Sequence, residues 1–282
     1  MKKTEEIIAS RQNRRVVELC KLTDRKAREA TRKFRFDGVK LLEEAIKNEL
    51  APDSIFLRAA EAERLYERYL KPLEACGFWD SVSVFVLTDE LFDKISEEKS
   101  PEGVICCAKY IDKFQKNITI YNSADFSRME NERIVLLESV RDPSNIGAVI
   151  RSAAALGVDR LIISSDCADI YHPRAVRASM GTLFNQPIDR VDDLPGVVAG
   201  LRESGRRVFA AALNTRAERL GSFPILRGDC VVIGNEGHGL TDATVAACTG
   251  SVLIPMSDRA ESFNAAVAAS ILMWEFSRKA EN

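Results

Sequence analysis

The sequence is poor in histidine and has no clustered cysteines. Only His172 and His238 are present among 282 residues, and the seven cysteines include no Cys-x-x-Cys pair. A zinc site needs His and Cys ligands at short, regular spacings, so this scarcity predicts a chain that holds no metal. The cysteines stand mostly in apolar strings such as GVICCAKY and GDCVVIG. We expect them to be buried, reduced thiols that pack as small hydrophobic side chains.

Long apolar runs are also missing. No run of 18 apolar residues occurs, which argues against a transmembrane span. The start, MKKTEEIIASRQNRR, is basic but lacks the apolar stretch of a secretory signal. The hydrophobic fraction of 46% is sufficient for a core, and the length is comfortable for two domains. We therefore expect a cytoplasmic, two-domain protein.

Several well-known catalytic motifs are absent. The dinucleotide fingerprint GxGxxG does not follow the first strand, which argues against a Rossmann oxidoreductase. No GK[ST] Walker loop occurs. No GxSxG elbow occurs either, and two histidines leave few general bases, which argues against a serine hydrolase.

The charge of the chain is unevenly distributed. Residues 1–40 hold 13 Lys and Arg against 6 Asp and Glu, a local charge of +7, whereas the remainder holds 27 against 36, a charge of −9. A basic front on an acidic body suggests a polyanionic partner. A solvated basic helix face explains the charge alone equally well.

The order of apolar patterns predicts an α/β fold in two parts. Residues 12–50 show helical spacing, and short β-runs such as SIFLRA and VSVFVL follow. Residues 122–132 are polar and aperiodic, and we expect a linker there between domains 1–121 and 133–282. In the second domain, β-runs alternate with helices, including helices expected at 145–156, 194–204 and 262–278. This alternation predicts a mostly parallel sheet covered on both faces.

The segment 138–164, ESVRDPSNIGAVIRSAAALGVDRLIIS, contains a strand, a turn and a helix. Asn145 is a candidate helix cap, and Arg151 lies six residues later on the same helix. The small face of Ala148, Ser152 and Ala155 allows another backbone to approach closely. A plain strand–helix unit with a capped helix would give the same pattern.

The segment 231–242, VVIGNEGHGLTD, runs from an apolar strand into a glycine-rich turn. Glycines allow backbone amides to approach a ligand, although one such turn is weak evidence for a site. Glu236, between Asn235 and the Gly237–His238 pair, makes a site more credible.

The segment 252–276, VLIPMSDRAESFNAAVAASILMWEF, joins a strand to the last helix. Ser262 is the expected N-cap and Asn264 lies in the first turn. The alanines at 265, 266, 268 and 269 form a small face, for which core packing is the plain explanation. Ser262 and Asn264 are then free to face a ligand.

In this order, the three segments resemble the three motifs of the SpoU (TrmH-like) RNA methyltransferase family over about residues 133–278. HPRAVRASMGTLFNQPI, residues 172–188, resembles the family's intervening segment. Residues 10–46 are similar to the start of the substrate-binding domain that many members carry. The third motif departs from the usual pattern, because Phe263 replaces a leucine and Ala265-Ala266 follow Asn264.

The resemblance implies a C-terminal trefoil-knotted SPOUT methyltransferase domain behind a smaller N-terminal α/β RNA-binding domain. It also implies a homodimer with active sites near the subunit interface, and S-adenosylmethionine as cofactor. Backbone groups at Leu213, Gly234, Ile254 and Phe263 would bind the cofactor. The implied catalytic site consists of Asn145, Arg151, Glu236, Ser262 and Asn264.

Arginine stays protonated in proteins, so Arg151 is a poor general base. Our hypothesis is that Arg151 binds an RNA phosphate and stabilises the charge that develops on the attacking ribose oxygen. Glu236 would orient Arg151 or Asn145. Alignment of the reacting atoms can supply on the order of 7–11 kcal/mol, and an activated methyl donor needs no metal.

The 2′-hydroxyl occurs in every RNA nucleotide, so selectivity must come from the front domain. Its basic residues are candidates for RNA contact, with Phe34 and Phe36 available for base stacking: Arg11, Arg14, Arg15, Arg25, Lys26, Arg32, Lys33 and Arg35. The two-domain layout favours ribosomal RNA over transfer RNA, with no DNA or membrane partner. A non-catalytic RNA-binding protein of the same fold is the alternative.

Overall fold

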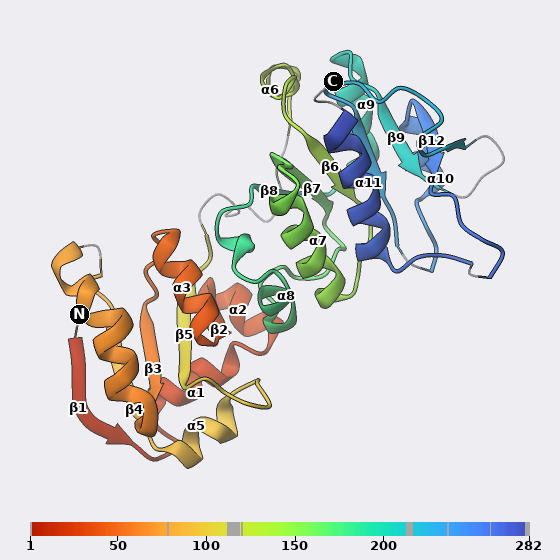
Figure 1. Ribbon diagram of the computed structural model, residues 1–282. Helices are drawn as coiled ribbons and strands as arrows, with labels where there is room; N and C mark the ends of the chain where they lie inside the picture. The colour runs from red at the N-terminus through yellow and green to blue at the C-terminus, as the bar shows by residue number, and fades with distance from the viewer. Residues whose placement is uncertain are drawn as a thin grey trace. The chain divides into compact units, whose positions relative to one another are not determined.

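The computed structural model describes residues 2–77, 79–111, 119, 121–212, 217–235, 237–259 and 261–279. The chain divides into two compact units (Figure 1). The first contains residues 1–111 and 169–185, and the second contains residues 112–168 and 186–282. The expected two-domain α/β organisation is thereby confirmed. The first unit, however, includes a segment from the middle of the second half of the sequence.

The described strands of the first unit form one five-stranded sheet in the order β1-β4-β3-β5-β2. β1, β4 and β3 are parallel, and β5 and β2 run antiparallel to their neighbours. The strands are β1 (Lys2–Ile8), β2 (Lys33–Asp37), β3 (Ser54–Arg58), β4 (Ser83–Leu87) and β5 (Val104–Lys109).

Helices α1 and α5 bury their apolar faces on this sheet, where Val16 and Phe92 join Phe56 and Leu87 in the core. Polar caps begin several helices, because Asn13, Asp24 and Thr88 accept backbone N–H groups of the first turn. The helices of this unit are α1 (Arg14–Lys21), α2 (Arg25–Thr31), α3 (Val39–Lys47), α4 (Ala62–Leu65), α5 (Asp89–Ile95) and α8 (Pro173–Ala178).

One part of the expected helical region is a strand. Arg32 adopts a left-handed conformation with φ of 54° and ends α2, after which β2 pairs with β5. Phe34 and Phe36 are 0% and 2% exposed. The helical expectation for residues 33–37 is therefore wrong, because burial and strand pairing override the local charge pattern.

The segment 169–185 completes the core of the first unit. Tyr171 stacks on Tyr110 with ring centroids 3.8 Å apart and contacts Phe34 at 4.9 Å, while Phe184 lies 5.2 Å from Phe36. Asp169 accepts two hydrogen bonds from the guanidinium of Arg28, at 2.7 and 3.0 Å. The first unit thus lacks part of its aromatic core unless this later segment is in place.

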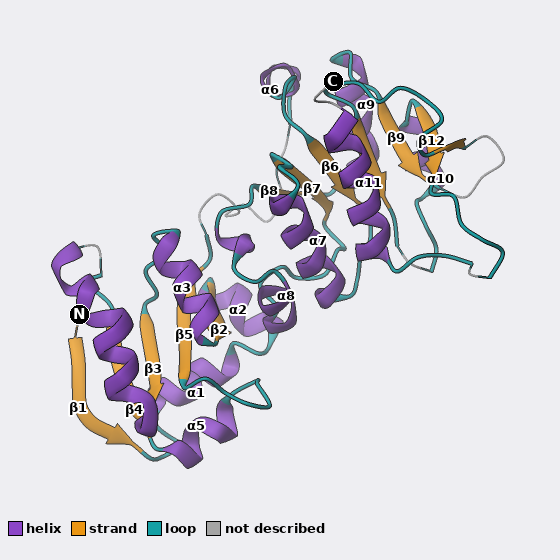
Figure 2. Cartoon of the chain, viewed as in Figure 1, coloured by secondary structure: helices purple, strands orange, loops and turns teal. Residues whose placement is uncertain are grey.

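The described strands of the second unit form a seven-stranded sheet in the order β10-β12-β9-β11-β6-β7-β8, with parallel pairing throughout. This confirms the expected parallel sheet (Figure 2). Its strands are β6 (Ile134–Leu137), β7 (Arg160–Ser164), β8 (Ile188–Val191), β9 (Val208–Ala211), β10 (Glu218–Arg219), β11 (Cys230–Ile233) and β12 (Gly250–Leu253).

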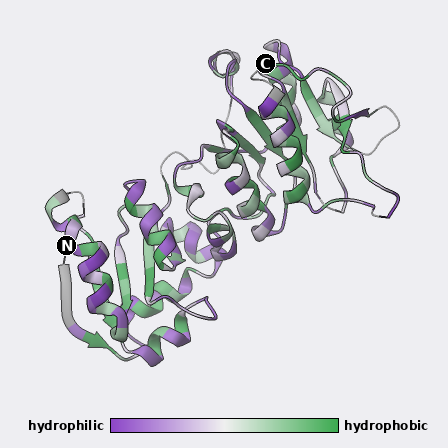
Figure 3. Ribbon diagram, in the orientation of Figure 1, coloured by the Kyte–Doolittle hydropathy of each residue, from purple (hydrophilic) through white to green (hydrophobic). Residues whose placement is uncertain are grey.

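Helices cover both faces of this sheet. Alternate strand residues such as Leu136 and Val232 point to one face of the sheet, where they pack with α9 and α6. The residues between them along each strand point to the other face, which α7 and α11 cover. Figure 3 shows the strands coloured hydrophobic and the outer helix faces hydrophilic. The helices are α6 (Ser123–Arg128), α7 (Pro143–Ala155), α9 (Leu194–Glu203), α10 (Asp242–Ala247) and α11 (Ala265–Lys279).

The stretch 122–132 that was expected as a linker contains α6, which a capping box of Asn122 and Asp125 begins. Phe126 and Met129 are buried in the core of the second unit. Two apolar residues one turn apart are too short a pattern to detect by periodicity, so the sequence did not predict this helix.

Helices α7 and α11 lie side by side (Figure 1), and the hydroxyls of Ser152 and Ser270 are 2.8 Å apart. The small faces predicted on both helices allow this close approach. The predicted caps are wrong by a few residues. Asp142 caps α7, with Pro143 in its first turn, and Asn264 rather than Ser262 caps α11.

The described cysteine side chains are free thiols, and all but Cys20 are buried. Burial raises the pKa of Cys230 and of Cys248 to about 12, so both are neutral at physiological pH. Within the described part of the chain, no three His, Cys, Asp or Glu side chains are placed to hold a metal, and no helix is long and apolar enough to cross a membrane.

Candidate cofactor and active site

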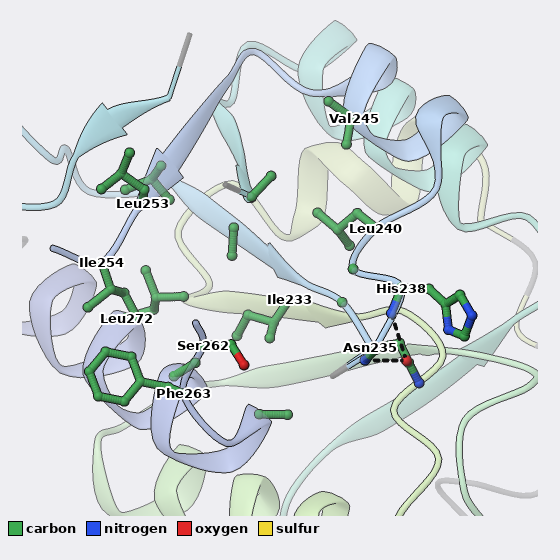
Figure 4. Close-up of a pocket in the computed structure, with 18 of the residues that line it drawn as sticks. Ile233, Asn235, His238, Leu240, Val245, Leu253, Ile254, Ser262, Phe263 and Leu272 are labelled. Atoms are coloured by element: carbon green, nitrogen blue, oxygen red, sulfur yellow. Dashed lines mark hydrogen bonds between the residues drawn. The ribbon is translucent and has the colours of Figure 1, made fainter. Parts of the chain in front are cut away.

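A cavity of about 630 Å³ lies at the carboxyl ends of β9, β11 and β12 (Figure 4). Ligands bind at this edge in open parallel sheets. The walls are mostly aliphatic, and Figure 4 shows Leu240 and Val245 on one side and Ile254, Phe263 and Leu272 on the other. The polar side chains of the lining are Asn235, His238, Asp242, Glu261 and Ser262. Such a lining suits an organic molecule with a flat apolar part and a few polar groups.

The glycine-rich turn after β11 closes on itself. Asn235 and Gly239 exchange backbone hydrogen bonds at 3.1 and 3.0 Å. A Cβ built on Gly234 would lie 2.4 Å from the carbonyl carbon of Gly239 and 2.7 Å from the nitrogen of Leu240. Gly234 is therefore required by the packing of the turn itself. It also lines the cavity, at a position where the family resemblance implies a cofactor contact.

The side chain of Asn235 holds this turn in shape. Its Oδ1 accepts the backbone N–H groups of Gly237 and His238 at 2.8 and 3.2 Å (Figure 4). Its Nδ2 donates to the carbonyl oxygen of Ser139 at 2.8 Å. The sequence showed Asn235 only as a neighbour of Glu236. The Asn235 side chain thus links the glycine-rich turn to the segment that follows β6.

The end of β6 is itself fixed by a polar network. Ser139 has φ of 55°, and its hydroxyl donates to Asp166 at 2.6 Å. Asp166 also accepts from Ser164 at 2.6 Å and from Arg141 at 3.1 Å. Burial raises the pKa of Asp166, but these hydrogen bonds outweigh it and hold the pKa below its ordinary value. Asp166 is therefore an ionised anchor beneath the turn.

A second carboxylate fixes the start of α10, which borders the cavity. Glu138 is 6% exposed and accepts the backbone N–H of Thr241 at 2.8 Å, together with the hydroxyls of Thr241 and Thr244 at 3.0 and 2.6 Å. The sequence analysis missed Glu138. The only signal in the sequence was that Glu138 is an acidic residue directly after the apolar run of β6. This signal does not indicate that Glu138 binds the start of α10.

The structure brings the first and third motifs together. The Nδ2 of Asn264 donates to the Oδ1 of Asn145 at 3.0 Å. The Oδ1 of Asn264 accepts the N–H groups of Ala266 and Val267 at 3.0 and 3.3 Å, so the side chain is fixed at both ends. Ser262, Phe263 and Ile254 line the cavity.

Arg151 is not brought into this cluster. It is exposed on α7 and does not line the cavity. Six residues correspond to about 600° of helix rotation, so Arg151 points roughly 120° away from Asn145. The other two predicted site residues, Glu236 and Leu213, lie outside the described residues.

The predicted RNA-contacting residues of the first unit fall into two groups. Arg35 is 1% exposed and makes a bidentate ion pair with Asp37, while Phe34 and Phe36 are buried. None of these three side chains is available to RNA, which corrects the sequence interpretation. The exposed members are Arg11, Arg14, Arg15, Arg25 and Lys26, and two others are partly buried, Arg32 over the ring of Tyr110 and Lys33 beside Asp53.

Comparison with known families decides what this fold is. Residues 132–274, just over half of the chain, match the SpoU rRNA Methylase family. The chain belongs to the SpoU rRNA methylase family. Residues 13–106 match the MRM3-like substrate binding domain, which lies within the first unit. The family assignment made from the three motifs is confirmed.

Several relatives match along most of their length. The 23S rRNA (guanosine(2553)-2'-O)-methyltransferase RlmP of Bacillus subtilis is 26% identical over 95% of this chain and 97% of its own. The SpoU methyltransferase AviRb of Streptomyces viridochromogenes, solved with AdoMet, has a TM-score of 0.74 at 25% identity over 94% of this chain and 98% of its own. An AdoMet-bound rRNA methyltransferase of Sinorhizobium meliloti has a TM-score of 0.78 at 24% identity and covers 97% of each chain, which shows the shared fold.

Proposed function

We propose that this protein is an S-adenosylmethionine-dependent RNA ribose 2′-O-methyltransferase that acts on ribosomal RNA. The observation that carries the proposal is the aliphatic cavity at the carboxyl ends of β9, β11 and β12. Asn264, which adjoins the cavity-lining residues Phe263 and Ala265, is hydrogen-bonded to Asn145 of α7. The relative RlmP, which this chain matches over 97% of its length, is named a 23S rRNA 2′-O-methyltransferase, and the Sinorhizobium meliloti structure is named an rRNA methyltransferase, which supports this substrate over transfer RNA.

The lining of the cavity fits S-adenosylmethionine. The aliphatic walls of Ile233, Leu240 and Ile254 suit an adenine ring. Asp242 and Glu261 offer carboxylates for the ammonium group and the ribose hydroxyls of the cofactor. When bound, the cofactor supplies a methyl group on a positively charged sulfur, which is already activated toward an oxygen nucleophile.

The residues of the chain have to position that nucleophile. In our proposal, Asn145 and Asn264 orient the ribose of the target nucleotide, and Ser262 lies against the cofactor. Because Asn264 is tied both to Asn145 and to the first turn of α11, it is preorganised, and little ordering is needed at the moment of reaction.

We further propose that the active enzyme is a knotted homodimer in which α7 and α11 form the interface. Val267 and Trp274 are 46% and 57% exposed and lie seven residues apart on one face of α11. Arg151 is exposed on the neighbouring helix α7. In the dimer, Arg151 reaches the active site of the partner, binds a phosphate of the RNA and stabilises the developing charge, and Glu236 orients it.

A mixed-subunit experiment tests this arrangement. Arg151→Ala and Asn264→Ala are each expected to abolish methyl transfer as homodimers. If each site combines residues of two subunits, an equimolar mixture that has exchanged subunits regains about a quarter of wild-type activity. No recovery in a mixture whose exchange is verified by mass spectrometry would contradict the composite site.

Trp274→Glu should shift the protein to a monomer in analytical ultracentrifugation.

The main test is methyl transfer to ribosomal RNA from a strain that lacks the gene. Wild-type protein should transfer tritiated methyl groups from S-adenosylmethionine, and primer-extension stops at low nucleotide concentration should map a 2′-O-methylated position. Binding of this RNA without transfer would instead support the non-catalytic alternative. Preferential transfer to transfer RNA would overturn the choice of substrate.

We propose that residues 1–121 select the RNA and residues 133–282 carry out the chemistry, in the cytoplasm. Removal of residues 1–121 is an unsuitable test of this division. It would strip Tyr171 and Phe184 of their aromatic partners and leave Asp169 without Arg28. Substitutions in the full chain keep both units intact.

A further inference from the structure

The first unit contains a second cavity, of about 440 Å³, which the proposed reaction does not use. It lies at the end of the sheet where β2, β3 and β4 begin, because Lys33, Ser54 and Ser83 all line it. One face of α1 forms the opposite wall. This volume is within the range of roughly 300–1,000 Å³ typical of sites for small organic ligands.

The floor of the cavity is aromatic. Phe56 and Phe85 are stacked with ring centroids 5.2 Å apart, and Leu19 and Cys107 complete the apolar surface. The guanidinium of Arg15 lies over the ring of Phe85, with 5.7 Å between its Cζ and the ring centroid. A flat arginine above an aromatic ring is an arrangement against which a nucleobase can stack.

The rim of the cavity is charged. Arg14 pairs with Glu18 at 2.8 Å and Lys33 pairs with Asp53 at 2.7 Å. Each acidic residue of the lining is therefore matched by one basic residue, and the charge of Arg15 is left as a surplus. The side chains of Ser54, Ser83 and Asp53 add hydrogen-bonding groups at the strand ends. Cations, an aromatic floor and polar edges together match the phosphate, base face and base edge of a nucleotide.

The surroundings favour RNA over a free metabolite. Arg11 precedes α1, and Arg25 and Lys26 begin α2, and all three are exposed. They lie at or just before the starts of α1 and α2, two helices that contribute Arg14 and Thr31 to the cavity lining. A free nucleotide would not need these cations, whereas the phosphates on either side of a captured nucleotide would contact them.

We propose that this cavity binds one unpaired nucleotide of the RNA substrate, with its base stacked on the guanidinium of Arg15 above Phe85 and its phosphate near Arg14 and Lys33. A base in a duplex is stacked and paired and cannot enter, so the cavity selects a loop or bulge. The proposal rests on the proposed function, because it names the feature of the RNA that the first unit recognises.

Three variants of the full chain test the cavity. Arg15→Gln removes the surplus cation, and Ser83→Tyr fills the cavity without a change of charge. Arg11→Gln is the matched control, because it removes the same charge four residues earlier and outside the cavity. Thermal unfolding temperatures equal to that of wild type establish that the variants fold. If Ser83→Tyr does not fold, Arg15→Gln alone decides the test.

Filter binding of unmodified 23S ribosomal RNA is the primary measurement, and methyl transfer is the second. We expect Arg15→Gln and Ser83→Tyr to weaken RNA binding about tenfold or more, because stacking contributes roughly 1–3 kcal/mol per base. The control should weaken it by no more than about threefold. KM for RNA should rise in parallel while kcat is retained, since the cavity is not part of the catalytic cluster.

Photocrosslinking of RNA that contains 4-thiouridine identifies the nucleotide. We expect a crosslink to β4 from a position that is unpaired in the RNA, and its loss in Ser83→Tyr. Equal effects of Arg15→Gln and Arg11→Gln, or a crosslink only from paired positions, would overturn the proposal. If wild-type protein binds RNA but transfers no methyl group, the proposed reaction fails and the binding data still decide the cavity.

Discussion

The two units each contain a cavity at one end of a sheet, but the two cavities are built from different chemistry. The cavity of the first unit has a rim of paired and unpaired charges around an aromatic floor. The cavity of the second unit is aliphatic, and its shape depends on a turn that closes tightly at Gly234. The charged cavity suits the RNA proposed for it, whereas the aliphatic cavity suits a small organic cofactor.

The same contrast extends to the interiors around them. In the first unit, Arg28 and Arg35 are each 1% exposed, and each is held by a carboxylate. Around the cofactor cavity, Asn235 and Glu138 instead hold backbone groups of the bordering turns. The first unit thus depends on pairing of side-chain charges, and the second on positioning of the backbone. Four measurements can break or sharpen this comparison.

The largest effect is expected from removal of the carboxylate that neutralises Arg28. Asp169→Ala leaves a buried guanidinium without its ion pair, which should lower the free energy of unfolding of the first unit by about 3–5 kcal/mol. Trp79 is buried in this unit, so urea titrations in a Trp274→Phe background report on it alone. Glu18→Ala, which breaks an exposed pair, should cost less than about 0.5 kcal/mol.

The second effect is a difference in salt dependence between the two sites. RNA binding should weaken by about 100-fold or more between 50 and 200 mM salt, because several phosphate contacts release counterions. The affinity for S-adenosylmethionine, measured by calorimetry, should change by less than about twofold over the same range. Similar slopes for both ligands would contradict the division into a charged and an aliphatic site.

The third effect concerns the turn at the cofactor cavity. In Gly234→Ala, a Cβ would lie 2.4 Å from the carbonyl carbon of Gly239, so the turn must open. We expect the affinity for S-adenosylmethionine to fall about tenfold or more, since overpacking costs roughly 1–3 kcal/mol. In Gly237→Ala the nearest atom lies at 3.5 Å, and the loss should be much smaller. Equal losses in both variants would mean that the close approach at Gly234 is unimportant.

The smallest effect is a pH dependence in the first unit. His172 caps α8 by accepting the N–H of Arg174, and burial together with Arg28 and Arg174 lowers its pKa below 6.5. As the pH falls below 6.5, the unfolded chain binds the proton more readily than the folded chain, so stability decreases. His172→Asn keeps a capping group and removes this titration.

Because His172 is partly exposed, solvent screening should keep the pH effect below about 1 kcal/mol. Urea titrations of both proteins at pH 5 and pH 7, in the Trp274→Phe background, measure it. The stability of wild type should fall more steeply with decreasing pH than that of the variant. Parallel curves would show that the ring of His172 does not couple to folding.

The parts of the fold that follow from local pattern could be predicted from the sequence. The alternation of apolar runs and helices after residue 133 predicted the parallel sheet, and the small faces of α7 and α11 predicted their close packing. β2 could not be predicted in this way, because it pairs with the distant strand β5, and Phe34 and Phe36 pack on Tyr171 and Phe184, more than 130 positions later. Charge density in residues 21–37 concealed a buried core.

The candidate site shows the same division. The motifs indicated Ser262, Phe263 and Ile254, which line the cavity, and Asn145 and Asn264, which are hydrogen-bonded. The six-residue spacing on one helix turns Arg151 roughly 120° from Asn145, but the motifs could not show that Arg151 is exposed and does not line the cavity. The helix caps were also missed, although Asp142 followed by Pro143 is a favourable sequence for a helix start.

The placement of residues 169–185 has a consequence for how the protein is made. The chain passes between the two units three times, at residues 111–112, 168–169 and 185–186. As a ribosome releases the chain from its N-terminus, the aromatic core of the first unit stays incomplete until Phe184 has emerged. By then β6, α7 and β7 have already been synthesised. The first unit therefore cannot finish folding until residues 112–168 of its partner unit have been translated, and its aromatic rings remain uncovered during that time.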